Sequence, residues 1–433
     1  MGREPGREPP AARVSIMETM SVPLVLHPFS LTTRTPGDFL EIVRGDGCRV
    51  WDAQGRGYLD GTASLWYCNA GHGRRQIADA VAAQMSELEA YHTFTRFTNR
   101  PQQRLAELLL ALEPIPDARV FLTCGGSEAI DTALKLARAG HKAAGDGGRT
   151  VFLSRLYAYH GVMLGGTSAG GLPANRDPFG PLLPDVFQVE RDSLDAMRAA
   201  VEYHGPERIA AIIAEPVIGA GGVFPPPDGY LEGLREVCDQ SGALLIFDEV
   251  ITAFGRLGSW FAAHHYGVTP DLMTFAKGVT SGYLPLGGVI VGPRVRAWLE
   301  ADDAYLLTHG GTYAGHPSCC VAGIANLEIL RSERLPDRAR ERGGRLRRGL
   351  EALAGRPGMV EVRGEGLMQA IALAPELDAR VFSEALLSRG VIARALPYAN
   401  SVAYSPPLIV SEAEIDELLA ATEETLDELA ASA

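Results

Sequence analysis

The chain has 433 residues, of which 46% are hydrophobic and 21% charged, and its formal net charge is −13 with a pI near 5.3. An acidic chain of ordinary globular composition is poorly suited to bind nucleic acid, because nucleic-acid partners carry basic patches. No apolar run reaches the length of a membrane span, so we expect no membrane partner.

The chain opens with a segment that does not look globular. Residues 1–20 contain a GREP repeat and prolines but no apolar signal-peptide core. They are predicted to be a disordered extension, and Met17 or Met20 is a candidate natural start. Residues 21–70 carry a hairpin pattern around 54–57, and we expect them to form the first part of a small domain.

Strand and helix patterns alternate from about residue 75. Helices are predicted over 75–88, 102–112, 128–143 and 229–241, and strands over 120–124, 151–154, 209–214, 244–248, 273–276 and 288–291. Such alternation predicts an α/β fold with a mostly parallel sheet. We assign it to a large domain over 71–310.

The last part of the chain, 311–433, is predicted to complete the small domain. A charge-rich helix is expected over 328–354, followed by strands in VEVRGEGLMQAIAL and VIARAL. Ser411 and Glu414 have the spacing of a capping box for a final helix.

The cysteines indicate neither a metal site nor a disulfide framework, because none of them forms a C-x-x-C pair. The six are Cys48, Cys68, Cys124, Cys238, Cys319 and Cys320. We therefore expect no metal and a reducing, cytoplasmic location.

Two apolar strand patterns each end on an ionisable residue. LLIF runs into Asp248 and Glu249, and LMTFA runs into Lys277. Ligands bind beyond the carboxyl ends of parallel strands, so a carboxylate and an amine are expected at one sheet edge. Such an amine can form a Schiff base, and pyridoxal phosphate needs this lysine together with an acid for its pyridine nitrogen. From these residues alone, a plain salt bridge is an equally good interpretation.

Longer sequence motifs are more informative than the spacing of these two residues. The segment 247–290 reads FDEVITAFGRLGSWFAAHHYGVTPDLMTFAKGVTSGYLPLGGVI, and shorter landmarks occur around it: SLWYCNAGHG, CGGSEAIDTALKLAR, AYHG, AEPVIGAGG, HGGTYAGHP and SPPLIVSEAEID. In this order they resemble the class III (omega) pyridoxal-phosphate-dependent aminotransferases, from about Thr33 to the C-terminal region. The resemblance implies fold type I, with a large domain and a smaller α/β domain formed by both ends of the chain.

The resemblance also implies roles for individual residues. Lys277 would hold pyridoxal 5'-phosphate as a Schiff base and later move a proton, and Asp248 would pair with the pyridine nitrogen. Gly126 and Ser127 would contact the phosphate, with Thr312 of the partner subunit as a second contact in a homodimer. The further cofactor contacts would be Tyr159 (stacked on the ring), His160, Glu215 and Val250.

Several of these residues have a plain structural interpretation as well. Ser127 could cap a helix, Tyr159 and Val250 could be core residues, and Glu215 and Thr312 could be turn residues. The chain also departs from the family at Gly125, where a serine is usual. The lost hydroxyl leaves more of the phosphate contact to backbone amides and Ser127.

The implied substrate pocket rests on fewer residues. Trp66 matches the family's aromatic wall, and Arg394 matches the arginine with which many omega-aminotransferases hold a substrate carboxylate. Phe94, Leu65 and Phe29 are further candidates, each of which could instead be core, and Arg394 could be a solvated surface residue. The segment after Arg394 is slightly longer than the family's usual loop.

The predicted function is transamination from an amine or omega-amino acid donor to a keto acid such as pyruvate, in a ping-pong cycle via pyridoxamine phosphate. An aminomutase, a racemase or a dialkylglycine-type decarboxylase of the same fold would keep the same lysine and aspartate, and these remain alternatives. A relative without cofactor is disfavoured by Lys277, Asp248, Tyr159 and Thr312. A nucleotide-binding Rossmann protein is disfavoured because the G-x-G-x-x-G turn is missing.

Overall fold

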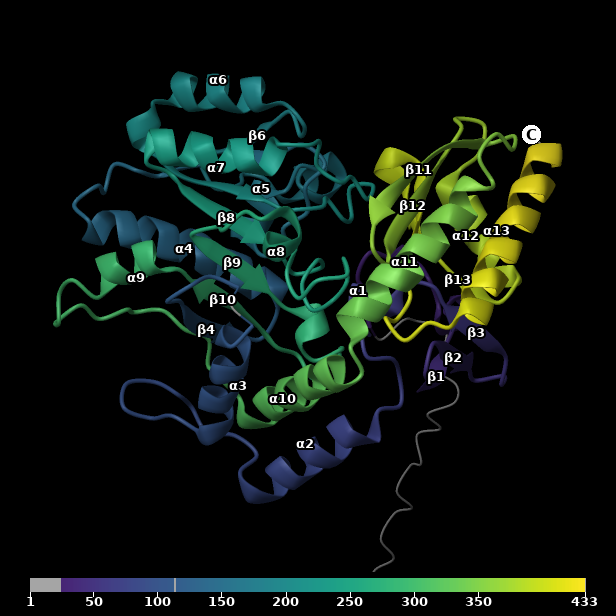
Figure 1. The fold of residues 1–433 in the computed structure, drawn as a ribbon, viewed down its shortest axis with the longest axis horizontal. Coiled ribbons are helices and arrows are strands. Elements are labelled where there is room, and N and C mark those ends of the chain that lie inside the picture. Colours follow the sequence, from purple (N-terminus) through teal and green to yellow (C-terminus); the bar gives the residue numbers. More distant parts are fainter. Residues whose placement is uncertain (1–24, 113, 433) are drawn as a thin grey trace, which may run out of the picture.

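The computed structural model describes residues 25–112 and 114–432, which form one large and two small sheets with covering helices (Figure 1). The extension expected over 1–20, with the candidate starts Met17 and Met20, lies outside the described residues.

The large sheet has seven strands in the order β4-β10-β9-β8-β7-β5-β6. β9, β8, β7, β5 and β6 run parallel to their neighbours in this order, and β10 runs antiparallel to β9 and β4. The prediction of a mostly parallel sheet is therefore confirmed. The strands are β4 (Arg119–Thr123), β5 (Val151–Arg155), β6 (Val186–Val189), β7 (Ile209–Ala214), β8 (Leu244–Asp248), β9 (Leu272–Phe275) and β10 (Gly287–Val291).

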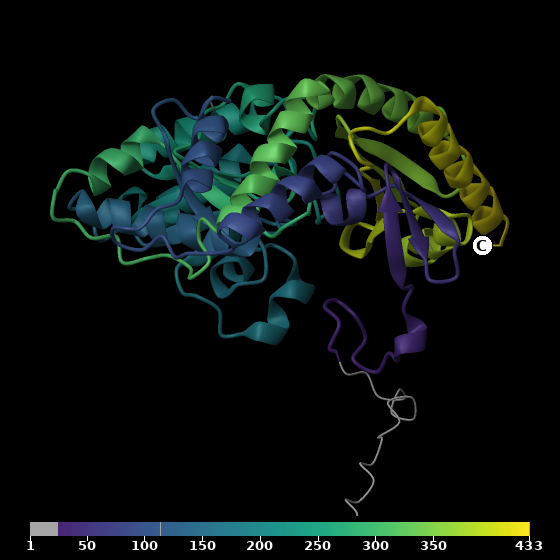
Figure 2. The ribbon, with the colours of Figure 1, turned by 90° about the horizontal axis from the view of Figure 1, so that it is seen from below.

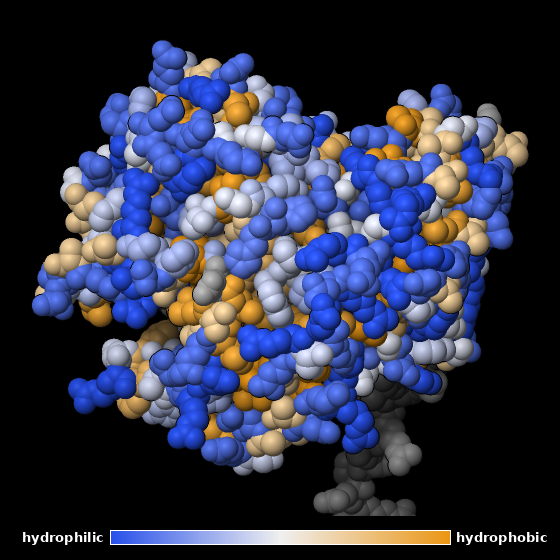
Figure 3. All heavy atoms as spheres, in the orientation of Figure 1, coloured by the Kyte–Doolittle hydropathy of each residue, from blue (hydrophilic) through white to orange (hydrophobic). Residues whose placement is uncertain are grey.

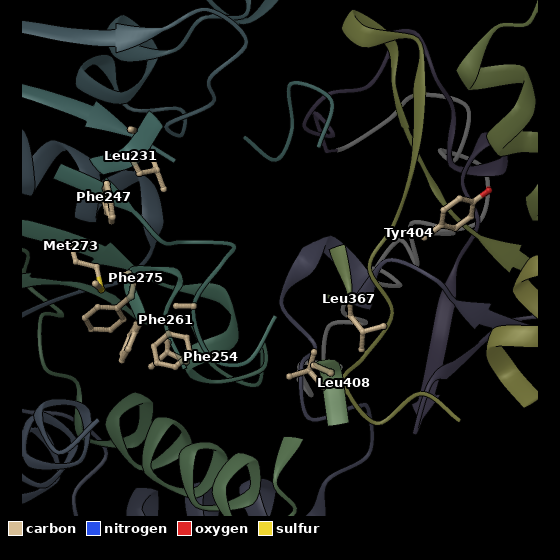
Figure 4. Close-up of a cluster of buried hydrophobic side chains, with 14 of the residues drawn as sticks. Leu231, Phe247, Phe254, Phe261, Met273, Phe275, Leu367, Tyr404 and Leu408 are labelled. Carbon is tan, nitrogen blue, oxygen red and sulfur yellow. The ribbon is translucent and has the colours of Figure 1, made fainter. Parts of the chain in front are cut away.

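Helices cover both faces of this sheet, which is why its central strands are continuous apolar runs. On one face, Ile246 belongs to the core cluster that contains the buried side of α4 (Gly126–Ala143). On the other face, Phe247 belongs to the cluster of α7 (Tyr230–Ser241). Figure 4 shows this second cluster, where Phe247, Met273 and Phe275 point toward Leu231, Phe254 and Phe261.

Two four-stranded sheets lie together beside the large one (Figures 1 and 2). The first, β1-β2-β3-β13, contains β1 (Ile42–Asp46), β2 (Arg49–Asp52), β3 (Gly57–Asp60) and β13 (Val391–Ile392). The second, β11-β12-β15-β14, contains β11 (Met359–Glu365), β12 (Met368–Leu373), β14 (Arg394–Leu396) and β15 (Ser401–Tyr404). The hairpin predicted around 54–57 is confirmed, because β2 and β3 pair antiparallel.

Two sequence predictions were wrong in this region. The single helix expected over 328–354 is two helices, α10 (Pro317–Ser332) and α11 (Leu335–Glu351). The break occurs because Arg334 adopts a left-handed conformation (φ 53°) and Pro336, which lacks an N–H, is tolerated only in a first turn. VIARAL is not one strand either. β13 pairs parallel with β3, whereas β14 pairs antiparallel with β15 in the other sheet.

The remaining helices comprise those predicted over 75–88 and 102–112, the predicted final helix, and others that were not predicted. They are α1 (Ala63–Trp66), α2 (Arg75–Glu87), α3 (Arg100–Leu110), α5 (Leu164–Ala169), α6 (Leu194–His204), α8 (Ala262–Tyr266), α9 (Pro293–Leu299), α12 (Ala379–Ser388) and α13 (Glu412–Ser432). The capping box before α13 is confirmed. Ser411 N donates to Glu414 Oε2 (2.8 Å) and Glu414 N donates to Ser411 Oγ (3.2 Å).

Hydrophilic residues cover most of the face drawn in Figure 3, and hydrophobic residues gather low on it, where α10 and α2 lie in Figure 1. In the described part of the chain, no helix combines the length and the apolar character needed to cross a membrane.

Candidate active site

Lys277 lies just beyond the carboxyl end of β9, in a short 3-10 turn over Lys277–Val279. Its backbone is left-handed (φ 44°), a costly conformation for a residue with a side chain, so the surroundings must hold it in place. Asn326 of α10 supplies that support. Its buried Nδ2 donates to the carbonyl oxygens of Gly278 (2.8 Å) and Val279 (2.9 Å).

The amine of Lys277 is tuned by its surroundings. Burial lowers its pKa to about 8, against the opposing effect of the Asp248 and Glu215 carboxylates, and Arg394 lowers it slightly further. A lysine with a pKa near 8 is neutral in a substantial fraction of molecules near physiological pH. It can therefore act both as a nucleophile and as a proton carrier.

Asp248 ends β8, the neighbouring strand, and is held on both oxygens. Oδ2 lies 2.8 Å from His160 Nδ1, and Oδ1 accepts from Val250 N (3.1 Å) and Thr274 Oγ1 (3.2 Å). Asp248, His160 and Thr274 are all buried. The contacts from His160, Val250 and Thr274 fix the orientation of the Asp248 carboxylate and so the direction of its remaining lone pairs.

Glu215 follows β7 and connects two loops of the site. Its Oε1 accepts from Tyr159 N (2.9 Å) and its Oε2 from Gly219 N (2.8 Å). Burial raises the pKa of this carboxyl group and also that of the Tyr159 hydroxyl. The Glu215 carboxylate opposes the lowering of the Lys277 pKa, and the Arg394 guanidinium opposes the rise of the Tyr159 pKa.

The turn between β4 and α4 has the form of an anion seat. α4 is 18 residues long, and its first amides have no helical partner. Gly126 lies close to Val250, because a Cβ on Gly126 would be 2.9 Å from Val250 Cγ1. Ser127 Oγ accepts from Val162 N (3.0 Å). Gly125 differs from its neighbour, since a Cβ there would meet no atom within 4 Å and its φ is an extended 173°.

Trp66 and Arg394 form a second wall. The Arg394 guanidinium lies 4.9 Å from the centroid of the Trp66 ring, within cation–π distance. Trp66 is buried and its Nε1 donates to Ser405 Oγ (2.8 Å). Ala63, Ser64 and Trp66 all have positive φ, and the Asp60 carboxylate supports this turn by accepting from Ser64 N (2.7 Å).

Within a single chain, the other predicted pocket residues do not lie beside Trp66 and Arg394. Phe29, Leu65 and Phe94 are exposed (76%, 43% and 44%), and Phe94 packs edge-on against His92. Thr312 is exposed as well, in a turn between α9 and α10. The single chain therefore unites Lys277 with the carboxylates, aromatic residues and arginine, and leaves these four at its surface.

Sequence reasoning missed the residues that support the site. Thr274 had a visible signal, because it is the only hydroxyl residue in the apolar strand LMTF. Asn326 had one too, as an amide in the apolar stretch VAGIANL of a helix. Asp60 and Ser405 gave no local signal, since their partners lie far along the chain or in an irregular turn.

Residues 33–426 match the family model described as aminotransferase class-III. The chain belongs to the class III aminotransferases. Among curated relatives of this class III aminotransferase, diaminobutyrate–2-oxoglutarate transaminase of Halomonas elongata is 36% identical over 90% of both chains. Beta-alanine–pyruvate aminotransferase of Pseudomonas aeruginosa is 39% identical over 80% of this chain and 82% of its own.

Solved structures agree with this assignment. A transaminase from the marine bacterium Virgibacillus is 35% identical and superposes with a TM-score of 0.91 over 96% of this chain and 99% of its own. An amine transaminase from an uncultivated Pseudomonas species, solved with bound pyridoxal phosphate, is 37% identical, with a TM-score of 0.88 over 94% and 99%. This class III aminotransferase thus has the fold type I architecture, is a transferase of amino groups and depends on pyridoxal phosphate.

Proposed function

We propose that this aminotransferase moves the amino group of an amine or omega-amino acid to a keto acid such as pyruvate, in a ping-pong cycle through pyridoxamine phosphate. The observation that carries the proposal is the Lys277 amine, whose pKa near 8 is set by burial beside Asp248 and Glu215. A neutral amine at the carboxyl edge of the sheet is what Schiff-base chemistry requires.

The residues around Lys277 fit pyridoxal phosphate. Asp248, oriented by His160, would hold the pyridine nitrogen, and Tyr159 and Val250 would pack on the ring. Gly126 and Ser127 would hold the phosphate on the α4 amides, with Thr312 of the partner subunit as a further contact. When bound, the cofactor supplies an electron sink for the substrate carbon.

Lys277 has a second role in this proposal. Its freed amine would take a proton from the substrate carbon and return it to the cofactor carbon, as general base and then general acid. The lowered pKa suits both steps, because the group can carry or release a proton near neutral pH. Glu215 would stay close to the cofactor through its bond to the backbone of Tyr159.

Arg394 would bind the carboxylate of an amino acid or keto acid. Its guanidinium rests on Trp66, and its Nε has no hydrogen-bond partner among the described residues. A planar guanidinium binds a carboxylate with two parallel hydrogen bonds. Pyruvate is favoured as acceptor because several relatives, including a beta-alanine–pyruvate and a putrescine–pyruvate aminotransferase, carry it in their names.

The proposal also covers the assembly. A homodimer would bring Thr312, and with it Phe94, Leu65 and Phe29, toward the partner's site from their exposed positions. The large domain would span 71–310, and the small domain would combine 21–70 with 311–433. A cytoplasmic location is supported by the six cysteines, which are all free thiols.

An aminomutase, racemase or decarboxylase would use the same Lys277 and Asp248, so the reaction needs a direct test. The enzyme loaded with pyridoxal phosphate is mixed with an amine donor and no acceptor. A transaminase accumulates pyridoxamine phosphate and releases one carbonyl product per site without CO2. A racemase or aminomutase instead returns an isomer of the donor, and a dialkylglycine-type decarboxylase releases CO2 together with its carbonyl product. Donor panels against pyruvate and 2-oxoglutarate then identify the acceptor, and Lys277→Ala serves as the inactive control.

A further inference from the structure

Arg394 stands at the start of a hairpin whose shape fixes where its guanidinium can reach. β14 and β15 pair antiparallel, with Arg394 opposite Ala403 and Leu396 opposite Ser401. The tip between them is a 3-10 turn over Pro397–Ala399. Any movement of the tip relative to the large sheet therefore changes the position of Arg394.

The tip packs on the part of the chain that surrounds the large sheet. The ring of Tyr398 lies 4.7 Å from the ring of Tyr157 at 61°, an edge-on contact. Tyr157 in turn packs edge-on against Phe224 at 5.4 Å and 81°. Next to Tyr398, Ala399 Cβ approaches within 2.6 Å of where a Cβ on Gly222 would lie.

These contacts lead directly to the candidate cofactor site. Tyr157 precedes Tyr159 by two residues, and Gly222 and Phe224 belong to the loop that follows Glu215. The bond from Tyr159 N to Glu215 Oε1 (2.9 Å) joins the two segments. The hairpin tip thus rests on the same two segments that carry Tyr159 and Glu215.

The surface under Tyr398 is held firmly. The guanidinium groups of Arg191 and Arg363 lie 3.6 Å and 4.3 Å from the centroid of Phe224. Arg363 also donates to Gly222 O (2.7 Å) and to Ser401 Oγ of the hairpin. Arg363 lies on β11, in the same sheet as the hairpin, whereas Arg191 follows β6 of the large sheet. Their contacts with Phe224 therefore join the two sheets, and the contact of Tyr398 with Tyr157 adds to this connection.

We propose that Tyr398 is a positioning residue for Arg394: by packing on Tyr157 it fixes the β14–β15 hairpin against the cofactor site and so sets the reach of Arg394 toward a substrate carboxylate. The inference rests on the proposed function in assigning the carboxylate to Arg394. It makes Tyr398 a determinant of selectivity between acceptors that carry a carboxylate and acceptors that do not.

The test compares two acceptors with one amine donor, using the holoenzyme. KM is measured for pyruvate and for butanal, an aldehyde without a carboxylate, in the wild type, Tyr398→Ala, Tyr398→Phe and Arg394→Ala. An edge-on aromatic pair corresponds to about two- to tenfold in an equilibrium constant, so Tyr398→Ala should raise KM for pyruvate by about that factor. KM for butanal should not change. Tyr398→Phe keeps the ring and should behave as wild type.

Tyr203→Ala is the matched control, because Tyr203 is an exposed tyrosine on α6, outside this cluster. It should leave both KM values unchanged. In the double variant Tyr398→Ala/Arg394→Ala, KM for pyruvate should equal that of Arg394→Ala alone, since Tyr398 acts only through Arg394.

The outcomes separate the inference from the function on which it rests. If Arg394→Ala raises KM for pyruvate and Tyr398→Ala leaves it unchanged, or raises both KM values equally, the positioning role is overturned and the role of Arg394 stands. If Arg394→Ala leaves KM for pyruvate unchanged, the assignment of the carboxylate to Arg394 is overturned and the inference with it.

Discussion

The Nδ1 atom of His160 lies 2.8 Å from Oδ2 of Asp248, and both side chains are almost completely buried. The other ring nitrogen, Nε2, has no hydrogen-bond partner among the described residues. The only side-chain hydrogen bond of His160 among the described residues is therefore the one to Asp248, the carboxylate that ends β8. His160 orients the carboxylate that is proposed to hold the pyridine nitrogen, although its own ring is hydrogen-bonded at only one nitrogen.

Replacing His160 should impair the chemical step more than substrate binding. We expect His160→Ala to lower kcat about ten- to a hundredfold, because a hydrogen bond to a charged group contributes about 1.5–3 kcal/mol. His160→Asn, whose amide can still donate to Asp248, should recover part of this loss. Single-turnover rates with donor alone measure the effect, and unchanged rates in His160→Ala would contradict the proposed role of the pair.

Chemical trapping can identify the Schiff-base lysine without ambiguity. The full sequence contains three lysines, Lys135, Lys142 and Lys277. We expect borohydride reduction of the holoenzyme, followed by peptide mapping, to find the cofactor on Lys277 alone. Lys142→Arg, at an exposed position, should give the same label and full activity. A label on Lys135 or Lys142 would show that the assignment is wrong.

The lowered pKa of Lys277 predicts how the cofactor-free enzyme captures pyridoxal phosphate. Only the neutral amine attacks the aldehyde, and a lysine with an ordinary pKa would be neutral only above about pH 10. With a pKa of about 8, the neutral fraction of Lys277 should rise through that pH. Initial rates of visible-absorbance growth should therefore increase up to a plateau above about pH 9. A rate that keeps rising to about pH 10.5 would contradict a lowered pKa.

The sequence predicted the edge of the large sheet well because the signal there is local. Apolar runs that end at Asp248 and Lys277 become strands buried on both faces, and their ends share one edge. The second wall was less predictable, because Trp66 takes its partner Ser405 from the other end of the chain. Local residue patterns do not predict hydrogen bonds between residues so far apart in the sequence.

The errors in the fold have the same origin. VIARAL has the alternation of one strand, and only the tertiary arrangement divides it between β13 and β14. The charge-rich stretch after residue 328 has a helical pattern throughout, yet Arg334 turns left-handed and separates α10 from α11. Local propensity is a weak predictor where packing requires a change of direction.

Gly125 and Gly126 should respond in opposite ways to serine. Gly125 has free space and an extended backbone, so Gly125→Ser should fold normally and add a hydroxyl beside the phosphate position proposed at Gly126 and Ser127. We expect pyridoxal phosphate to bind about tenfold tighter, from one hydrogen bond to a charged group. Gly126→Ser would press on Val250, which lies 2.9 Å from the new Cβ, and should bind the cofactor more weakly. Equilibrium dialysis measures both, and equal affinities would contradict the prediction.

Glu249 makes stability depend on pH. It is fully buried, its Oε1 accepts from Ala263 N (2.8 Å), and its Oε2 accepts from Ala262 N (2.6 Å) at the start of α8. Burial raises its pKa to about 7 from an ordinary 4.5. The folded state therefore binds more protons than the unfolded state between these values, so stability should fall as pH rises from about 4.5 to 7.

The comparison of Glu249→Gln with the wild type tests this dependence. The variant cannot ionise, so its melting temperature should change less across this pH range than that of the wild type. Glu341→Gln, at an exposed position of α11, is the matched control and should keep the wild-type profile. Parallel profiles for Glu249→Gln and the wild type would contradict the raised pKa.

The pairing of β13 with β3 has a consequence for synthesis of the protein. Leu59 N donates to Gly390 O (2.8 Å). β3 is therefore synthesised early, whereas β13, the strand that pairs with it, is synthesised near the end of the chain. Until that partner leaves the ribosome, one edge of β3 is open, and open strand edges promote aggregation. Chains that terminate after α11 should therefore accumulate as insoluble protein, and the growing chain should depend on chaperones until its last segment is complete.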